Sequence, residues 1–292
     1  MTEIQQVCFA LDGDYMGHPY HVSGSALVHA ITSDSARLAG TTLNASTGVF
    51  VPGAYGVYPE EHSSGGINPS LGGTLPEVRT YEDLFLFRDA SHAWMLDSRP
   101  SAATNTHDLR VHGGKPVFAP TTTFGTPPGA FHDRRSVRWY VHAYFHSDNR
   151  SVLPLTEDEL SELAVGGARN NGYGRLEYVD SQLVDITDLD YSWLEDASQY
   201  CIELVSPYVL SSTYPHVRAS DIPWWWGVSG DRVRTRETRL VEHGTEYTLN
   251  TADHGQVFEY TGSDPIGTAK NGITRAGPHS KYGFGELRVL PQ

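Results

Sequence analysis

The sequence contains very little lysine. Of its 21 basic residues, 18 are arginine and 3 are lysine, and against 35 acidic residues they leave a formal net charge of -14. Such a charge argues against generic electrostatic attraction to nucleic acid. An acid excess with almost no lysine is typical of a protein adapted to high salt, in which the acidic surface maintains solubility. Local groups of arginine are therefore more informative about function than the net charge.

Cysteine is also scarce, with Cys8 and Cys201 the two in the chain. Both lie in apolar stretches that predict buried strands, where free cysteine is commonly found. No CxxC pair occurs, which excludes a zinc knuckle. The sequence contains neither an HExxH motif nor an Asp-rich cluster, and no serine nucleophile elbow. We therefore expect no metal and no other cofactor.

The sequence has no apolar run of membrane-spanning length and no basic and apolar leader. We expect a cytoplasmic protein with no membrane partner. With 292 residues, of which 39% are apolar, the chain can bury a core as one large domain or two small ones. Its 29 glycines and 17 prolines favour many short strands joined by turns.

One short phrase occurs twice, 111 positions apart, as Gly172-Tyr173-Gly174 and Gly283-Phe284-Gly285. In both copies one variable residue, a leucine and a predicted strand follow. Glycines beside an aromatic residue allow positive φ and close approach of the backbone to another molecule. A cation lies near each copy, and bare backbone with a cation and a ring suits RNA phosphates and bases. The residues of these two loops that we expect to contact RNA are Gly166, Gly167, Arg169, Asn170, Asn171, Gly172, Tyr173, Arg175, Lys281, Tyr282 and Phe284.

The N-terminal segment predicts a strand over 3–11, a turn over 12–18 and a helix over 26–37. Ser23 or Ser25 is the expected cap of this helix. A Ser-Gly-Ser sequence entering a helix presents free N–H groups that can hold a phosphate, so both serines are candidate RNA contacts. The alternative is an ordinary cap with nothing bound.

The middle of the chain, from about 40 to 130, predicts a loop-rich insertion with a few strands, at 83–89 and 93–96. A good alternating strand follows over 136–146. The segment 155–165 predicts a helix with a Thr156–Glu159 capping box that ends at Gly166. Further strands are expected over 200–205, 245–249 and 255–260, and after the last glycine loop.

A third candidate RNA contact is the triplet Arg232, Arg234 and Arg236. On a strand, period-two spacing places all three on one face as a ladder of about 7 Å per step, close to the phosphate spacing of an extended single strand. The alternative is a solvated edge strand whose arginines pair with nearby acids. In Trp224-Trp225-Trp226, at least one ring must point away from the others, to stack on a base or to join the core.

The 14 histidines raise the possibility of an enzyme. His142 and His146 are four apart, but on a strand they lie about 13 Å from each other and make no metal pair. A lone histidine can serve as the base of a metal-independent ribonuclease. His29 and His18, near the first helix, are the weak catalytic candidates, and ordinary surface or core histidine is the alternative.

Taken together, four segments resemble the RAMP superfamily of class 1 CRISPR-Cas effector proteins. The segment 19–31, through its residues 22–27, resembles the strand-to-helix glycine-serine signature of the superfamily, although the Lys-Gly that normally follows is missing. Residues 163–175 resemble its mid-chain glycine loop. Residues 253–260 resemble the Gly-x-Val-Phe strand of five-prime-handle-capping subunits, especially those of type III, and 277–290 resemble its C-terminal glycine-rich loop.

The resemblance implies an α+β fold of one or two ferredoxin-like (RRM-like) domains with antiparallel sheets, glycine-rich loops and a long insertion. We expect an N-terminal domain over 1–150, with its insertion at about 40–130, and a C-terminal half over 151–292 with both loops. The implied partners are a crRNA, backbone RAMP subunits, a nuclease or large subunit, and target RNA or DNA reached through the guide.

The role that fits best is a non-catalytic subunit that caps the five-prime handle of the guide. The alternatives are a backbone subunit along the guide, a metal-independent precursor-crRNA endoribonuclease, or a structural protein of a halophilic virus or cell. We expect the first loop, with Arg169 and Arg175, to matter more for phosphate binding. The second loop, with Lys281, should matter more for holding the C-terminal fold.

Overall fold

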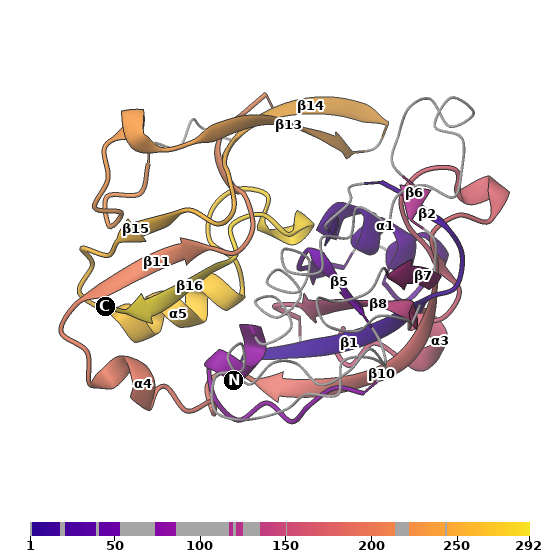
Figure 1. Ribbon diagram of the computed structural model, residues 1–292, viewed down its shortest axis with the longest axis horizontal. Helices are drawn as coiled ribbons and strands as arrows, with labels where there is room; N and C mark the ends of the chain where they lie inside the picture. The colour runs from indigo at the N-terminus through magenta and orange to yellow at the C-terminus, as the bar shows by residue number, and fades with distance from the viewer. Residues whose placement is uncertain are drawn as a thin grey trace.

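The computed structural model describes residues 2–17, 21–38, 41–52, 74–85, 117–118, 121–124, 135–149, 151–213, 222–242 and 244–292. Within these ranges the chain has the expected α+β fold, and its named strand pairs are antiparallel. Figure 1 shows two main sheets side by side, with the β13–β14 hairpin extending above both. We call the part that contributes strands from Glu3 to Asp185 the N-terminal half, and the part from Tyr200 to Pro291 the C-terminal half.

The N-terminal half has the βαββαβ order of a ferredoxin-like fold. Its central strands lie in the order β5-β8-β1-β10, so that β1 pairs with both β8 and β10. The elements of this order are β1 (Glu3–Leu11), α1 (Gly24–Asp34), β5 (Gly48–Pro52), β8 (Arg135–His146), α3 (Glu157–Leu160) and β10 (Arg175–Asp185). Shorter strands extend the half: β2 (Tyr15–Met16), β3 (His21–Val22), β4 (Asn44–Ala45), β6 (Val117–Phe118), β7 (Thr121–Phe124) and β9 (Leu163–Ala164).

The C-terminal half contains a smaller sheet in the order β15-β11-β16. Its elements are β11 (Tyr200–Leu204), β15 (Val257–Glu259), α5 (Pro265–Ile273) and β16 (Leu287–Pro291), with α4 (Ser192–Glu195) before them. A separate three-stranded sheet lies between β11 and β15 in sequence, formed by β12 (Tyr208–Ser212), β13 (Thr235–Glu242) and β14 (Thr245–Ala252). The C-terminal half thus keeps the first strand, third strand, second helix and last strand of the ferredoxin-like order.

The two halves repeat the same strand pairing. Leu11 of β1 faces Leu176 of β10, and Leu204 of β11 faces Leu287 of β16. All four leucines are at most 1% exposed. Each pair lies where the last strand of its half leaves the glycine-rich loop. The chain therefore contains an internal structural repeat around the two loops.

Two large apolar clusters form most of the core among the described residues. In the first, the β1 residues Val7 and Phe9 pack with Leu27 and Ile31 of α1, so that the helix covers one face of the N-terminal sheet. The second cluster includes Ile4 of the same strand together with the C-terminal sheet and α5. Burial on both faces of β1 therefore joins the two halves.

A segment of the predicted insertion lies at this junction. Tyr81 is 1% exposed, and its hydroxyl accepts a hydrogen bond from the backbone N–H of Val289 in β16 at 3.0 Å. Tyr144 of β8 donates to the carbonyl of Leu84 at 2.7 Å. Residues 74–85 thus connect the N-terminal sheet to the last strand of the C-terminal half.

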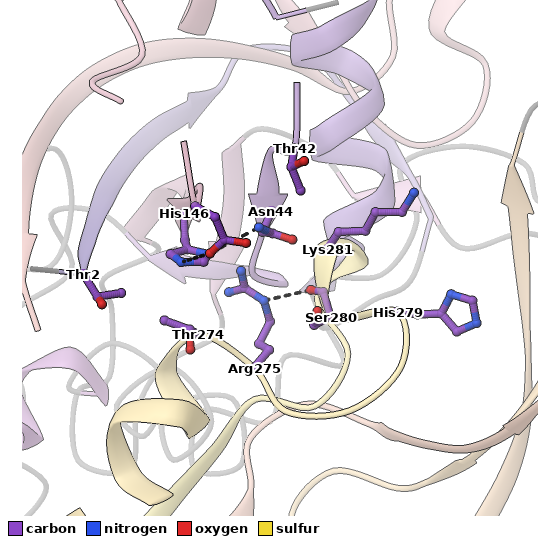
Figure 2. Close-up of a pocket in the computed structure, with 10 residues that line it drawn as sticks. Thr2, Thr42, Asn44, His146, Thr274, Arg275, His279, Ser280 and Lys281 are labelled. Carbon is purple, nitrogen blue, oxygen red and sulfur yellow. Dashed lines mark hydrogen bonds and ion pairs between the residues drawn. The ribbon is translucent and has the colours of Figure 1, made fainter. Parts of the chain in front are cut away.

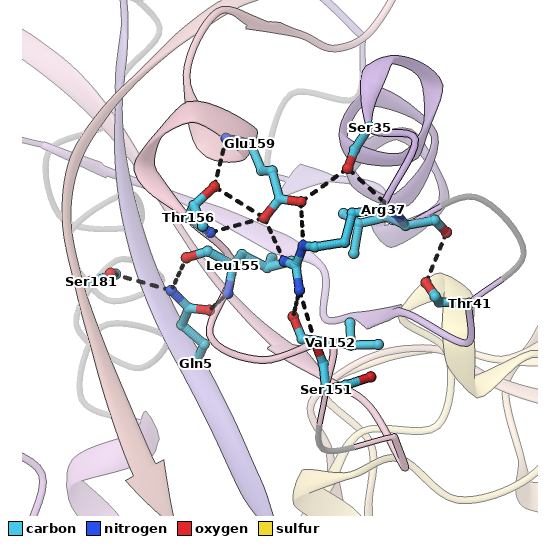
Figure 3. A network of polar contacts seen from close by, with 11 residues as sticks. Gln5, Ser35, Arg37, Thr41, Ser151, Val152, Leu155, Thr156, Glu159 and Ser181 are labelled. Carbon is cyan, nitrogen blue, oxygen red and sulfur yellow. Dashed lines mark hydrogen bonds and ion pairs between the residues drawn. The ribbon is translucent and has the colours of Figure 1, made fainter.

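The start of α3 is fixed to the end of α1 by a polar network (Figure 3). Thr156 and Glu159 form the predicted capping box. The Glu159 carboxylate also accepts hydrogen bonds from Arg37 Nε at 2.8 Å and Ser35 at 2.9 Å. The side chain of Gln5 in β1 bonds both backbone groups of Leu155, so α3 is fixed to the sheet as well.

Several predicted elements differ in extent or kind. The helix expected over 155–165 ends at Leu160, because Glu162 takes a positive φ of 58° and Leu163 pairs with Leu176 as strand β9. Gly166 therefore does not end the helix. A strand was expected over 83–89, but its first three residues belong to a single 3-10 turn, η3 (Glu82–Phe85). Residues 86–89 and 93–96 lie outside the described residues.

The sequence analysis did not predict the helix α5, although Asp264 followed by a proline is a helix-start signal. The first helix begins at Gly24 and ends at Asp34, earlier than predicted at both ends.

The division into domains at residue 150 stays a prediction. The strands β9 and β10 belong to the N-terminal sheet, and the first glycine loop, which lies between them, belongs to that half as well. Among the described residues, no helix is long and apolar enough to span a membrane.

Candidate nucleic-acid interface

Loop 1, residues 166–174, depends on residues that take positive φ. They are Gly166 at 81°, Ala168 at 56°, Gly172 at 82° and Gly174 at 69°. Between them lies one 3-10 turn, η5 (Arg169–Asn171). A Cβ at Gly174 would overlap the carbonyl oxygen of Val165, so that position requires glycine for space as well as for its φ.

Loop 2, residues 277–285, has the same backbone. Its positive-φ residues are Gly277 at 89°, His279 at 60°, Gly283 at 89° and Gly285 at 82°. The 3-10 turn η7 (Ser280–Tyr282) takes the place of η5. A Cβ at Gly285 would overlap the carbonyl oxygen of Ala276, as one at Gly174 would overlap Val165. The repeated sequence phrase thus corresponds to a repeated conformation.

Both loops are tied to the first strand of their half by matching hydrogen bonds. In the N-terminal half, Asp12 N donates to Arg175 O at 3.0 Å, and in the C-terminal half Val205 N donates to Glu286 O at 2.9 Å. The amide of Gly174 donates to Asp14, as that of Gly285 donates to Pro207. The strand pairing on each side therefore fixes the shape of its loop.

Loop 1 presents its tip to solvent. Arg169, Asn170, Asn171, Gly172 and Arg175 are exposed. A Cβ at Gly172 would meet nothing within 4 Å, so the backbone there is open to an approaching molecule. Among the described residues, no hydrogen bond or ion pair engages either guanidinium group. Arg169 and an open backbone thus lie at one exposed turn, and Arg175 lies directly after the loop as the first residue of β10.

The predicted contacts at the base of loop 1 have a different environment. Gly167 donates its backbone N–H to Met16 O at 2.8 Å, and a Cβ at Gly166 would lie 2.7 Å from the ring of Tyr15. Both glycines are partly buried, as is Tyr173. The base of the loop therefore packs on β2, and the tip carries the exposed groups.

Loop 2 is covered by the N-terminal half. Tyr282 is 4% exposed, and its hydroxyl donates to Glu242. Lys281 forms an ion pair with the same carboxylate at 2.7 Å. A Cβ at Gly283 would lie 3.0 Å from Thr47 N, because the turn between β4 and β5 covers the loop. Phe284 packs against the apolar cluster around Tyr282.

The entrance to α1 meets loop 2 and not loop 1. Ser23 is the helix cap, since its hydroxyl accepts the backbone N–H of Ala26 at 3.3 Å, and Ser25 Oγ lies 3.2 Å from Ser23 Oγ. A Cβ at Gly24 would lie 2.6 Å from the backbone carbonyl group of Tyr282. The glycine of the Ser-Gly-Ser sequence is therefore required for packing of the two halves.

The predicted arginine ladder is wrong. Arg232 belongs to a 3-10 turn, η6 (Gly230–Arg232), and the strand β13 begins at Thr235. Only Arg236 of the triplet lies on that strand, and it pairs with Asp253 at 3.3 Å. Arg234 N donates to the side chain of Gln256, which holds this segment against the β14–β15 connection. The three exposed guanidinium groups do not share one strand face.

The three tryptophans separate as expected, with at least one ring away from the others. Trp226 is 3% exposed and stacks on Phe258 with ring centroids 4.9 Å apart. Trp225 packs against Trp226 edge to face, whereas Trp224 is 78% exposed.

A second group of polar side chains gathers where α1 meets loop 2. The ring of Tyr282 stacks with His29 at a centroid distance of 6.1 Å and with His279 at 6.5 Å. Lys281 Nζ lies 4.5 Å from the same ring centroid. His279 Nε2 also lies 3.2 Å from Ser212 Oγ. His29, His279 and Lys281 thus each contact the ring of Tyr282, while His18 lies outside the described residues.

Burial lowers the pKa of His279, and Lys281 lowers it further, although Glu242 opposes the shift. The imidazole therefore stays neutral at neutral pH, as a general base requires. His279 and Glu242 were missed from the sequence, because only the pairing of β13, β14 and loop 2 brings them together. Within the described residues, no group of three or more histidine, cysteine or acidic side chains could hold a metal ion.

No protein-family model matches this sequence, and no curated protein matches it. Among solved structures, a protein described as "CRISPR associated protein Cas6" aligns over 100% of both chains, with 10% identity and a TM-score of 0.42. At that identity and TM-score the likeness supports no conclusion about the function of the present chain.

Proposed function

We propose that this protein binds single-stranded RNA through the tip of loop 1. The observation that carries the proposal is the contrast between two loops of one backbone shape. Loop 1 leaves two arginines and an open glycine exposed, whereas the cation of loop 2 is paired with Glu242. Exposed cations beside accessible backbone suit a phosphate chain, and they act locally in spite of the acidic net charge.

We further propose that the RNA is the crRNA of a CRISPR-Cas ribonucleoprotein and that the protein caps its five-prime handle without cutting it. Support comes from the four segments that resemble the RAMP superfamily. Backbone RAMP subunits and a nuclease or large subunit would be the partners, with target RNA or DNA reached through the guide. A position along the guide, as a backbone subunit, is the alternative within the same assembly.

The binding test is fluorescence anisotropy with labelled single-stranded RNA at several salt concentrations. The double variant Arg169→Ala/Arg175→Ala should weaken binding about tenfold and reduce the salt slope by about 2. The matched control is Arg79→Ala/Arg239→Ala, which removes the same charge from two exposed arginines that pair with Glu77 and Glu246. Equal losses in the two double variants would show that only net charge matters.

The role of the protein in an assembly is tested by sequencing the RNA that co-purifies from its native host. Discrete small RNAs with a shared five-prime end support handle capping. A purified complex without any discrete small RNA rules out the guide-binding role. A symmetric assembly free of nucleic acid would instead support a structural protein of a halophilic cell or virus.

A second function, metal-independent cleavage of precursor RNA, is favoured by the side chains at the junction of α1 and loop 2. His29 and His279 each stack with Tyr282, and Lys281 Nζ lies over the same ring. A neutral histidine can take a proton from a ribose hydroxyl, and a lysine can stabilise the developing charge on the phosphate.

Incubation of the protein with repeat RNA in EDTA tests this second function. Cleavage that is lost in His29→Ala and His279→Ala, but kept in a variant of the exposed His254, supports a ribonuclease site at the junction. Intact RNA after incubation with the folded wild-type protein contradicts it.

A further inference from the structure

A cavity of about 590 Å³ lies between the two halves, and no residue of loop 1 is among the residues that line it (Figure 2). One wall comes from the N-terminal half, and the other from the chain between α5 and η7. Its lining contains no apolar side chain among the described residues. The lining residues are Thr2, Thr42, Asn44, His146, Asp148, Thr274, Arg275, His279, Ser280 and Lys281.

The shape of the loop directs Arg275 into this cavity. Arg275 takes a positive φ of 71°, is 6% exposed, and donates from Nε to Ser280 O at 2.9 Å. Figure 2 shows its guanidinium group reaching from the C-terminal segment towards Asn44 and His146. A rare backbone conformation and a hydrogen bond thus hold a buried cation in one place.

The opposite wall holds a neutral histidine. His146 is 7% exposed, with Nδ1 3.3 Å from the amide nitrogen of Asn44 and Nε2 3.5 Å from the Asp148 carboxylate. Burial lowers the pKa of His146, and the charge of Arg275 lowers it further, which outweighs the opposite effect of Asp148. The side chain of Asp148 is 84% exposed, so its charge lies at the solvent-facing rim.

The remaining cation of the lining, Lys281, is balanced by Glu242. The interior wall of the cavity is therefore formed by one guanidinium group, imidazole and amide nitrogens, and hydroxyl groups. This set matches an oxygen-rich anion, because guanidinium groups bind phosphate in a bidentate geometry and hydroxyl groups donate to the remaining oxygens.

We propose that this cavity binds a nucleotide through its phosphate monoester. The volume falls in the range of about 300–1,000 Å³ that small-molecule sites occupy. The phosphate would lie against Arg275, and the hydroxyl-lined walls would receive the sugar. Two ligands contain such a phosphate monoester, a free nucleoside monophosphate and the phosphorylated end of an RNA. Only the second ligand rests on the proposal that loop 1 binds RNA.

The first measurement is isothermal titration calorimetry of the whole protein with adenosine 5′-monophosphate and, separately, with adenosine. Binding of the monophosphate with at least about tenfold preference over the nucleoside is expected, because the nucleoside lacks the charge-assisted contact to Arg275. The parallel measurement compares a 5′-phosphorylated RNA oligonucleotide with the same oligonucleotide that ends in a 5′-hydroxyl group.

The principal variant is Arg275→Ala, which should reduce the affinity for the monophosphate at least about tenfold. Because Arg275 is buried, a second variant keeps the test independent of folding. Thr42 is exposed at the rim, so Thr42→Glu places a carboxylate at the entrance without disturbing the core. It should weaken binding about fivefold, and the uncharged control Thr42→Gln less than about twofold.

The proposal would be overturned if the protein preferred neither the monophosphate over the nucleoside nor the 5′-phosphorylated oligonucleotide over its 5′-hydroxyl form. Binding unchanged in both Arg275→Ala and Thr42→Glu would also overturn it. A preference seen only with the phosphorylated oligonucleotide, and lost in Thr42→Glu, would support it and identify the RNA end as the source. The double variant Arg169→Ala/Arg175→Ala should leave monophosphate binding unchanged. Failure of RNA binding by loop 1 is therefore distinguishable from failure at the cavity.

Discussion

Loop 1 and loop 2 each place a 3-10 turn between residues of positive φ, yet Asn171 in the first is exposed whereas Tyr282, its counterpart in the second, is 4% exposed. The difference arises outside the loops. The entrance of α1 and the turn after β4 cover loop 2. At loop 1 the turn at Gly13 approaches the carbonyl oxygen of Gly172, but the side chains of the tip stay exposed. One backbone shape therefore serves as packing surface in one half and as candidate binding surface in the other.

The largest expected effect tests whether the two loops share one backbone requirement. Gly174→Ala and Gly285→Ala should each lower the free energy of unfolding by about 3 kcal/mol or more, because positive φ strain adds to overlap with a carbonyl oxygen. Urea unfolding measures both. The control Gly255→Ala, where φ is also positive but a Cβ meets nothing within 4 Å, should cost about 1 kcal/mol. Equal costs at all three positions would contradict a shared close contact.

A second pair of substitutions compares how closely the rest of the protein packs against each loop. Gly172→Ala should cost about 1 kcal/mol, since only φ strain is added. Gly283→Ala should cost about 2–3 kcal/mol, because the new methyl group also presses on the turn between β4 and β5. The same urea experiment compares them. If Gly172→Ala were the more costly of the two, the assignment of loop 1 as the open loop would be wrong.

The functional difference should appear in RNA retention. Arg169→Ala/Arg175→Ala is expected to weaken RNA binding about tenfold, equivalent to about 1.4 kcal/mol, because two unpaired cations are removed. Lys281→Ala should change RNA binding less than about twofold and lower stability instead, since it leaves the buried Glu242 carboxylate short of a partner. Reversed losses in an anisotropy titration would contradict this ranking.

The smallest effect concerns the helix before loop 1. Hydrogen bonds from Arg37, together with those from Thr156 and Ser35, lower the pKa of Glu159 to about 2 from its ordinary value of 4.5. A carboxylate with a depressed pKa stabilises the fold above pH 4.5, and this contribution is lost as the pH falls towards 2.

Wild-type protein should therefore exceed Glu159→Gln in stability by about 1 kcal/mol at pH 7, with the gap closing towards pH 2. Thermal unfolding across that pH range measures the gap. The control Glu157→Gln, at an exposed position of the same turn, should show a gap less than half as large. A gap that stays constant from pH 7 to pH 2 would show that the ion pair does not stabilise α3.

Much of the local structure could be predicted from the sequence. The alternation over 136–146 gave β8, and the Thr156–Glu159 spacing gave the capping box. Helix length was less predictable, because the apolar spacing of Leu160 and Leu163 fits a helix as well as a helix followed by a strand. The prediction that the three arginines share one strand face was wrong for a similar reason, since period-two spacing does not reveal where a strand begins.

Some residues of the candidate sites could be predicted from the sequence, and others could not. Arg169 and Arg175 could be found because they are neighbours of a recognisable glycine phrase. Arg275, His146, His279 and Glu242 could not, because they come from segments far apart in the chain and meet only when the two halves pack.

The sequence by itself determined the two loop conformations, because glycine at 174 and 285 permits a backbone that a side chain would obstruct. It also determined the strands that carry them. The tertiary structure alone decided which loop is buried, which cations are paired and where a polar cavity forms. Those properties depend on contacts between the two halves. The local residue pattern of one half does not specify which segments of the other half pack against it.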